Sequence, residues 1–79
     1  MKDFYLARDS KGKLILFNQK PTKKKYIYNN EFPEYRCEFM GWTTQDYERF
    51  GIGFMVVDEQ LYPEVTYENS PKKVTFKVV

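Results

Sequence analysis

The sequence predicts a mainly β domain, either a single small antiparallel sheet or an open barrel, with five or six strands. Short segments rich in Val, Ile, Thr, Phe and Tyr alternate with clusters of Gly, Pro, Asn, Asp and Ser, as strands alternate with turns. The connections are short and show no strand–helix–strand rhythm, which favours antiparallel pairing. One short helix is expected near residues 44–50, and the 79 residues form a single domain, 1–79.

The N-terminal segment has the pattern of a β-hairpin. Residues 3–8 (DFYLAR) alternate in the manner of a strand, and residues 9–12 (DSKG) carry turn formers at both ends. Residues 13–17 (KLILF) form a second predicted strand with apolar side chains on both faces. Because both faces are apolar, this strand is expected in the interior of the sheet.

The next segment is predicted to pass from a loop into further strands. Residues 18–25 are polar and carry four lysines, so an exposed loop is expected. Residues 26–30 resume a strand-like composition, which Pro33 interrupts. Residues 35–42 alternate cleanly, as a half-buried antiparallel strand does, with Cys37 on the apolar face.

Residues 43–51 (TTQDYERFG) are the one plausible helix. Either of the two leading threonines can cap it, and Gly51 can end it. A helix of fewer than about eight residues is marginal without packing, which Tyr47 and Phe50 are expected to supply. A long hairpin loop is the competing interpretation.

A further apolar strand is predicted over residues 52–58. Gly53 within it marks a bulge or a close approach of two backbones. Residues 59–63 follow as one tight helical turn, since Asp58 can cap it and Pro63 must end it.

The C-terminal segment is predicted to turn the chain into a last strand. Residues 64–67 are expected as a short extended piece, residues 68–71 as a turn, and residues 72–79 as the final strand. Leu61 and Val65 are expected to enter the core.

The composition argues against catalysis and cofactor binding. The chain has no histidine and one cysteine, which excludes an internal disulfide, a histidine base and an ordinary zinc site. Cys37 is expected to act as a small buried hydrophobe. We therefore expect a protein that is not an enzyme and has no catalytic residue, metal or cofactor.

Charge is spread unevenly along the chain. Residues 1–28 carry eight basic and two acidic groups, whereas residues 29–68 carry nine acidic and two basic groups. The plain interpretation is that basic and acidic strands lie side by side and pair across the sheet. The alternative is a molecule with one positive and one negative face, which would steer a charged partner.

The expected location is the cytoplasm. A lone cysteine suits a reducing compartment. We expect no signal peptide, because charged residues interrupt the first twenty positions. No apolar run approaches the ~20 residues that a membrane helix needs, so no membrane partner is expected.

Single-stranded nucleic acid is the alternative partner. The Lys20–Tyr28 segment (KPTKKKYIY) combines lysines with two tyrosines, as grooves that follow a nucleic-acid backbone do. The acidic balance of residues 29–68 opposes such binding, and only Arg8 and Arg36 are available for base recognition. The competing interpretation is a solvated lysine loop with its tyrosines packed in the sheet.

Protein–protein interaction remains as the predicted function. The chain has seven Phe, seven Tyr and one Trp, more aromatic residues than a small core requires, together with sheet edges that can accept a strand. The partner is an unidentified protein, and a homodimer is one form of it. The candidate contact residues are Lys23, Lys24, Lys25, Tyr26, Tyr28, Trp42, Tyr47, Tyr62 and Tyr67.

Both ends of the chain resemble a group of small uncharacterised bacterial and phage proteins. The likeness lies in the hairpin YLARDSKGKLILF (residues 5–17) and in DEQLYPEVTYENSPKKVTF (residues 58–76). In that group the C-terminal pattern is Leu-(Phe/Tyr)-Pro-Glu-Val followed by an aromatic, an acid and a proline. The resemblance implies a small intracellular accessory protein, derived from a phage or mobile element, and assigns no activity.

Overall fold

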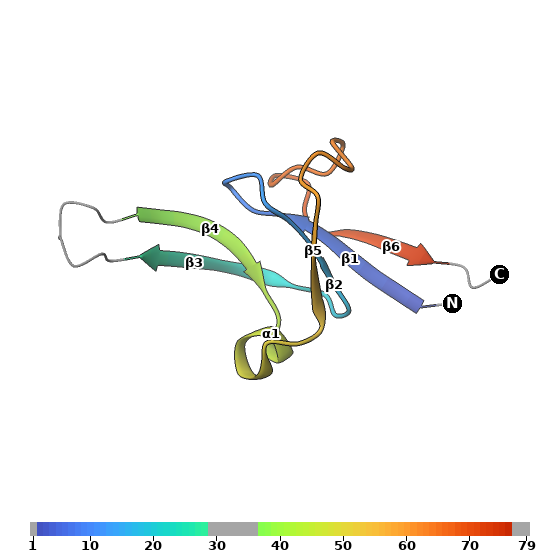
Figure 1. Cartoon of the computed structure of the whole chain (residues 1–79), viewed down its shortest axis with the longest axis horizontal. Coiled ribbons are helices and arrows are strands. Elements are labelled where there is room, and N and C mark those ends of the chain that lie inside the picture. The colour runs from blue at the N-terminus through green and yellow to red at the C-terminus, as the bar shows by residue number, and fades with distance from the viewer. Residues whose placement is uncertain (1, 29–36, 77–79) are drawn as a thin grey trace.

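The computed structural model describes residues 2–28 and 37–76, with side chains for residues 3–27 and 38–75. These residues form six strands and one helix (Figure 1). The mainly β, antiparallel prediction is confirmed, although the described strands divide into two sheets instead of one and do not close into a barrel. Expectations for residues 29–36 and 77–79 lie outside the described residues.

The larger sheet has four strands in the order β5-β2-β1-β6, and every pairing is antiparallel. Its strands are β1 (Lys2–Arg8), β2 (Leu14–Phe17), β5 (Phe54–Val57) and β6 (Lys72–Phe76). The predicted hairpin is confirmed: Arg8 pairs with Leu14 and Tyr5 with Phe17 across a turn that ends at Gly12. β2 lies inside the sheet, as its two apolar faces predicted.

The smaller sheet is the ribbon of β3 (Thr22–Tyr28) and β4 (Cys37–Thr43), which extends away from the larger sheet in Figure 1. β3 begins at Thr22, so the prediction of a loop over residues 18–25 is wrong for its second half. Lys24 pairs with Gly41 and Lys25 with Met40, and the three consecutive lysines 23–25 are all exposed. A two-stranded ribbon exposes side chains on both faces, so it accommodates consecutive lysines, which composition alone assigned to a loop.

The core lies on both faces of the four-stranded sheet. Leu6 and Leu14 pack with Val65 of the C-terminal segment on one face. On the other face Ala7 and Phe17 pack with Trp42 of β4. Successive strand residues point to opposite faces, so neighbouring apolar residues in β1 and β2 supply both clusters.

Helix α1 (Gln45–Phe50) confirms the predicted helix. The Thr44 side chain accepts a hydrogen bond from the Tyr47 N–H, and Gly51 ends the helix with φ 63°. The Tyr47 ring packs edge-on against Phe17 and Phe54. Phe50, the last residue of α1, is 68% exposed, so its expected packing role is wrong, although a position three residues after Tyr47 lies on the same side of a helix.

No helix within residues 2–28 and 37–76 is long and apolar enough to cross a membrane.

The segment between β5 and β6 is a series of turns closed around one side chain. The Arg8 guanidinium donates its five N–H groups to five backbone carbonyls, at 2.6 to 3.2 Å. The acceptors are the carbonyls of Gly12, Glu59, Leu61, Tyr62 and Val65.

This arrangement corrects three expectations for the segment. The Asp58 side chain caps a turn by accepting from the Gln60 N–H, but no helical turn follows. Residues 64–67 form turns instead of an extended piece. Val65 is buried as predicted, whereas Leu61 is 52% exposed, because its carbonyl faces Arg8 and its side chain faces solvent.

Candidate protein-interaction site

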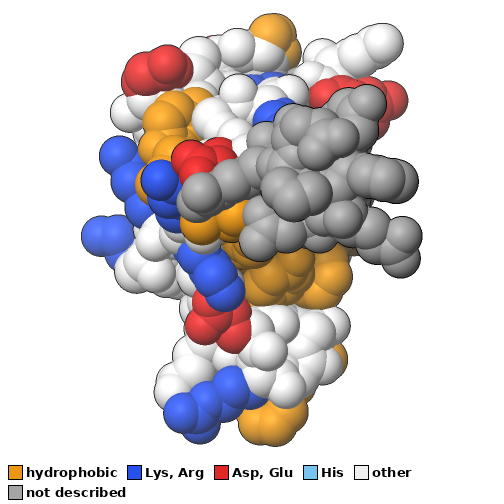
Figure 2. Space-filling model, turned by 90° about the vertical axis from the view of Figure 1, so that its left-hand side faces the viewer, with side chains coloured by type: hydrophobic (Ala, Val, Ile, Leu, Met, Phe, Trp, Pro, Cys, Tyr) orange, Lys and Arg blue, Asp and Glu red, His pale blue; other side chains and the backbone are white. Residues whose placement is uncertain are grey.

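The three candidate lysines lie on β3, and each meets a group of this chain. Lys24 forms an ion pair with Glu48 of α1, and Lys25 lies 3.2 Å from the Glu38 carboxylate. The hydrogen bond between Lys24 and Glu48 raises the pKa of Lys24 and lowers that of Glu48. In Figure 2 basic and acidic side chains lie beside one another instead of in one basic patch. The pairing of basic and acidic segments is therefore confirmed for these two lysines.

Lys23 lies over aromatic rings where the two sheets meet. Its Nζ is 5.9 Å from the Trp42 ring centroid and 5.4 Å from that of Tyr67. Trp42 is 6% exposed, and its Nε1–H donates to the Arg8 carbonyl at 3.0 Å. Trp42 therefore joins the two sheets, and Tyr67 packs beside it.

Tyr26 packs within the β3–β4 ribbon. Its ring stacks on Phe39, with 5.0 Å between the ring centroids, and lies over Gly41. A Cβ atom at position 41 would be 2.7 Å from the Tyr26 ring, so glycine makes room for this stack. Burial raises the pKa of the Tyr26 hydroxyl.

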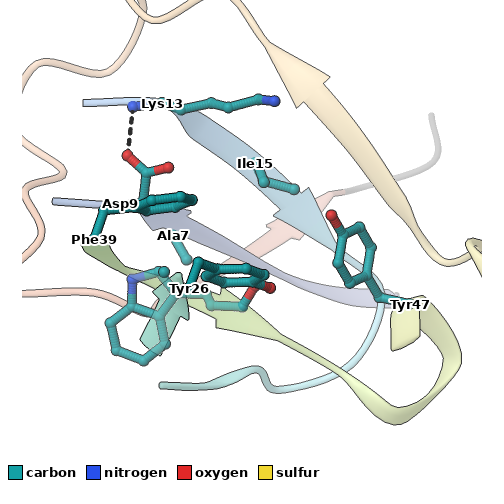
Figure 3. Close-up of a pocket in the computed structure, with 9 residues that line it drawn as sticks. Ala7, Asp9, Lys13, Ile15, Tyr26, Phe39 and Tyr47 are labelled. Atoms are coloured by element: carbon teal, nitrogen blue, oxygen red, sulfur yellow. Dashed lines mark hydrogen bonds between the residues drawn. The ribbon is translucent and has the colours of Figure 1, made fainter. Parts of the chain in front are cut away.

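A small cavity of about 70 Å³ lies between the two sheets (Figure 3). Asp9 lines one side, where its carboxylate accepts from the backbone N–H groups of Lys11 and Lys13, and Tyr47 of α1 closes the far side. The cavity holds a few waters at most, well below the roughly 300 Å³ of a small-molecule site.

The remaining candidates are Tyr47, Tyr28 and Tyr62, which lie in different parts of the fold. Tyr47 is a core contact of α1, and the side chains of Tyr28 and Cys37 lie outside the described residues. Tyr62 is 41% exposed at a loop position with φ 52°. The structure thus gathers Lys23, Lys24, Tyr26, Trp42, Tyr47 and Tyr67 around the junction of the two sheets, while Lys25 lies farther along the ribbon and Tyr62 in the loop held by Arg8.

The most exposed apolar surface of the described residues lies at β5, away from the contact residues predicted from the sequence. β5 is an edge strand that carries no charge, and Phe54, Met55 and Val56 are 37%, 58% and 55% exposed. Phe50 and Ile52, just before it, are 68% and 57% exposed. The apolar composition of residues 52–58 is typical of a buried strand, so only pairing partners could have shown that it lies at an edge.

The two edges of the four-stranded sheet differ in how well they are protected against the addition of a further strand. β6 carries exposed Lys72 and Lys73, and Lys73 pairs with Asp3 at 3.2 Å. Charged side chains of this kind discourage a further strand. The side of β5 that faces away from β2, called the open edge below, has no such residue within Phe54–Val57.

The open edge presents defined hydrogen-bonding groups. The Asn18 N–H donates to the Gly53 carbonyl at 3.0 Å, so these residues form a hydrogen-bonded pair. Such pairs alternate along an antiparallel ladder, so Met55 and Val57 bond to β2. The N–H and C=O groups of Phe54 and Val56 consequently point to the open edge.

The comparisons with family models, curated proteins and solved structures find no match for this chain. The resemblance to small phage and bacterial proteins thus stays a prediction, and the candidate site is defined by geometry.

Proposed function

We propose that this chain is a non-enzymatic protein-binding domain that accepts a β-strand of a protein partner at the open edge of β5. The observation that carries the proposal is this uncharged edge, whose backbone groups at Phe54 and Val56 point outward among exposed apolar side chains. Strand addition obtains affinity from main-chain hydrogen bonds and specificity from the flanking side chains.

A protein partner is favoured over nucleic acid by the surroundings of the lysines. Two of the three neighbouring lysines on β3 already meet carboxylates, and the third lies over aromatic rings. A phosphate chain would have to displace Glu48 and Glu38 before it gained those contacts. The open edge of β5 requires no such displacement.

The non-enzymatic part of the proposal rests on the histidine-free composition and on the Asp9 carboxylate, which is engaged by backbone amides. We place the protein in the cytoplasm as a small accessory protein, an assignment that the single cysteine supports. Its origin in a phage or mobile element is the part of the proposal that rests on the resemblance.

The proposal is tested with the substitution Val56→Pro. It removes one outward N–H, and the β2 ladder does not use that N–H. Thr75→Pro is the matched control on the opposite edge. The Asp9 N–H donates to the Lys13 carbonyl, so Asp9 and Lys13 form a hydrogen-bonded pair between β1 and β2. Hydrogen-bonded pairs alternate along β1, so Phe4 and Leu6 bond to β6 instead. The N–H of Thr75, which lies between residues of β6 that bond to β1, therefore points outward.

The measurement is capture of proteins from cytoplasmic extract by the immobilised chain. We expect the parent chain to capture a protein. Val56→Pro should abolish this capture, whereas Thr75→Pro and a variant with Lys23, Lys24 and Lys25 changed to Glu should retain it. Capture that survives Val56→Pro, or no capture of any protein including this chain itself, would contradict the proposal. In parallel, submillimolar binding to a labelled single-stranded oligonucleotide with a steep salt dependence would favour nucleic acid instead.

A further inference from the structure

We infer that the strand taken up by the open edge is β5 of a second copy of this chain, which joins two four-stranded sheets into one antiparallel sheet. This inference rests on the proposed function and names its partner. The edge is suited to itself because an isologous pairing places identical strands across a two-fold axis, and β5 carries no charge that would meet a like charge.

The outward backbone groups favour one register, because only a pair centred on Met55 uses the outward groups of both Phe54 and Val56 within β5 of each copy. With N–H and C=O directed outward at Phe54 and Val56, an antiparallel pair sets Phe54 opposite Val56 of the second copy, and Val56 opposite Phe54. Each of these two pairs exchanges two hydrogen bonds. Met55 then faces Met55 of the second copy across the axis as a non-hydrogen-bonded pair, with Cα atoms about 4.5 Å apart.

The side chains match this register on both faces of the sheet. The Phe54 ring packs edge-on against Tyr47, with 4.7 Å between the ring centroids, and would lie beside Val56 of the second copy. The two Met55 side chains would meet on the opposite face, where a flexible thioether fills irregular gaps. Aromatic and β-branched neighbours across strands are favourable pairs.

The exposed area is sufficient for a modest dimer. The five exposed apolar residues from Phe50 to Val56 leave about 450 Å² uncovered per copy, if a whole residue exposes roughly 150–200 Å². Two copies would bury about 900 Å² if the whole of this surface is covered in each, which is close to the ~1,000 Å² that marks a specific interface. A patch of this size on a monomer is often functional.

Charge at the two ends of β5 also fits an antiparallel pair. The strand is followed by Asp58 and Glu59, and α1, just before it, ends with Arg49 in its last turn. A two-fold axis through Met55 brings the acidic end of one β5 toward the α1 end of the other. Arg49 of one copy then lies toward the acidic end of the other, while Glu48 of α1 is already paired with Lys24, which favours the antiparallel orientation.

Disulfide trapping tests the register. In a Cys37→Ser background, which removes the only native cysteine, Met55→Cys places two sulfurs across the axis at a Cα separation that suits a disulfide. Val56→Cys is the matched control, because its exposure is nearly equal but its two copies would be about 8 Å apart. We expect covalent dimer from Met55→Cys at a rate at least ~10-fold above that of Val56→Cys. Equal rates would overturn the inference.

Sedimentation equilibrium tests the dimer without covalent trapping. We expect the mass to rise toward about 19 kDa, twice the 9.6 kDa of the chain, between about 1 and 500 µM. Val56→Pro should keep the monomer mass throughout, with an unchanged far-ultraviolet circular dichroism spectrum, and Thr75→Pro should dimerise like the parent chain.

The two proposals fail in distinguishable ways. A parent chain that stays at 9.6 kDa, or forms only open-ended aggregates, overturns the second copy as partner. If that monomer still captures another protein in a manner that Val56→Pro abolishes, the proposed function stands with a different strand. A dimer that Val56→Pro leaves intact overturns the β5 pairing.

Discussion

Among the charged residues that the structure describes, Arg8 is the one whose replacement should destabilise the domain most. Its guanidinium donates to five carbonyls, four of which belong to the segment that runs from Glu59 to Val65. That segment carries Val65, which closes one face of the core beside Leu6 and Leu14. The side chain therefore connects the hairpin to a segment more than fifty residues away in sequence.

The size of the effect follows from the number and exposure of these bonds. A hydrogen bond contributes about 0.5–1.5 kcal/mol net, so five would total about 2.5–7.5 kcal/mol. Three of the five are exposed, which places the sum in the lower part of that range. We expect Arg8→Ala to lower the free energy of unfolding by about 2–4 kcal/mol, and Tm by about 10–20 °C. Arg8→Lys keeps the charge but loses the planar fork, and should recover less than half.

Urea unfolding followed by fluorescence of Trp42, the only tryptophan and 6% exposed, measures the change. Native-state hydrogen exchange locates it: the Leu61 and Val65 amides, bonded to Asp58 and Tyr62, should exchange faster. Arg49→Ala, on the exposed side of α1, serves as the control. A loss below about 0.5 kcal/mol, with those two amides unchanged, would refute the reasoning, since that is the range of ordinary surface substitutions.

Three further predictions concern other parts of the molecule. Gly41→Ala should lower the free energy of unfolding, measured in urea, by about 1–3 kcal/mol, because the new Cβ meets the Tyr26 ring at 2.7 Å. In a Tyr26→Ala background the same substitution should cost less. Additive effects of the two substitutions would contradict the clash. The hydrogen bond to Lys24 lowers the pKa of Glu48 from 4.5, so this pair contributes stability above pH 4.5 that is lost as pH falls through the lowered pKa. Glu48→Gln should reduce the loss of stability over that acidic range. An unaltered profile of stability against pH would disprove the coupling. The Tyr62→Gly variant should have a free energy of unfolding about 1 kcal/mol higher than Tyr62→Ala, because φ is 52° at this position and glycine adopts that conformation without strain. Equal free energies from thermal unfolding would show that the backbone relaxes.

The sequence predicted those parts of the fold that depend on neighbours along the chain. The β1–β2 hairpin follows from alternation and from a turn that ends at Gly12, and α1 follows from a threonine cap and Gly51. Each of these features is local, so composition and spacing suffice to indicate it.

Candidate residues chosen by side-chain type were only partly predictive. Trp42 and Tyr47 are aromatic, as interface residues often are, yet one is buried and the other packs in the core. The lysines of β3 meet Glu48 and Glu38, which lie in α1 and β4. Their chemistry was visible in the sequence, but the groups that surround them were not.

By itself, then, the sequence determined the antiparallel β class, the hairpin, the short helix and the lack of histidine chemistry. Only the tertiary structure decided that β5 lies at an unprotected edge, that the strands form two sheets, and that Arg8 holds the C-terminal turns. Periodicity specifies which faces of a strand are apolar, but not which strand lies beside it. The neighbour is selected by contacts between residues far apart in the chain, which no local pattern records.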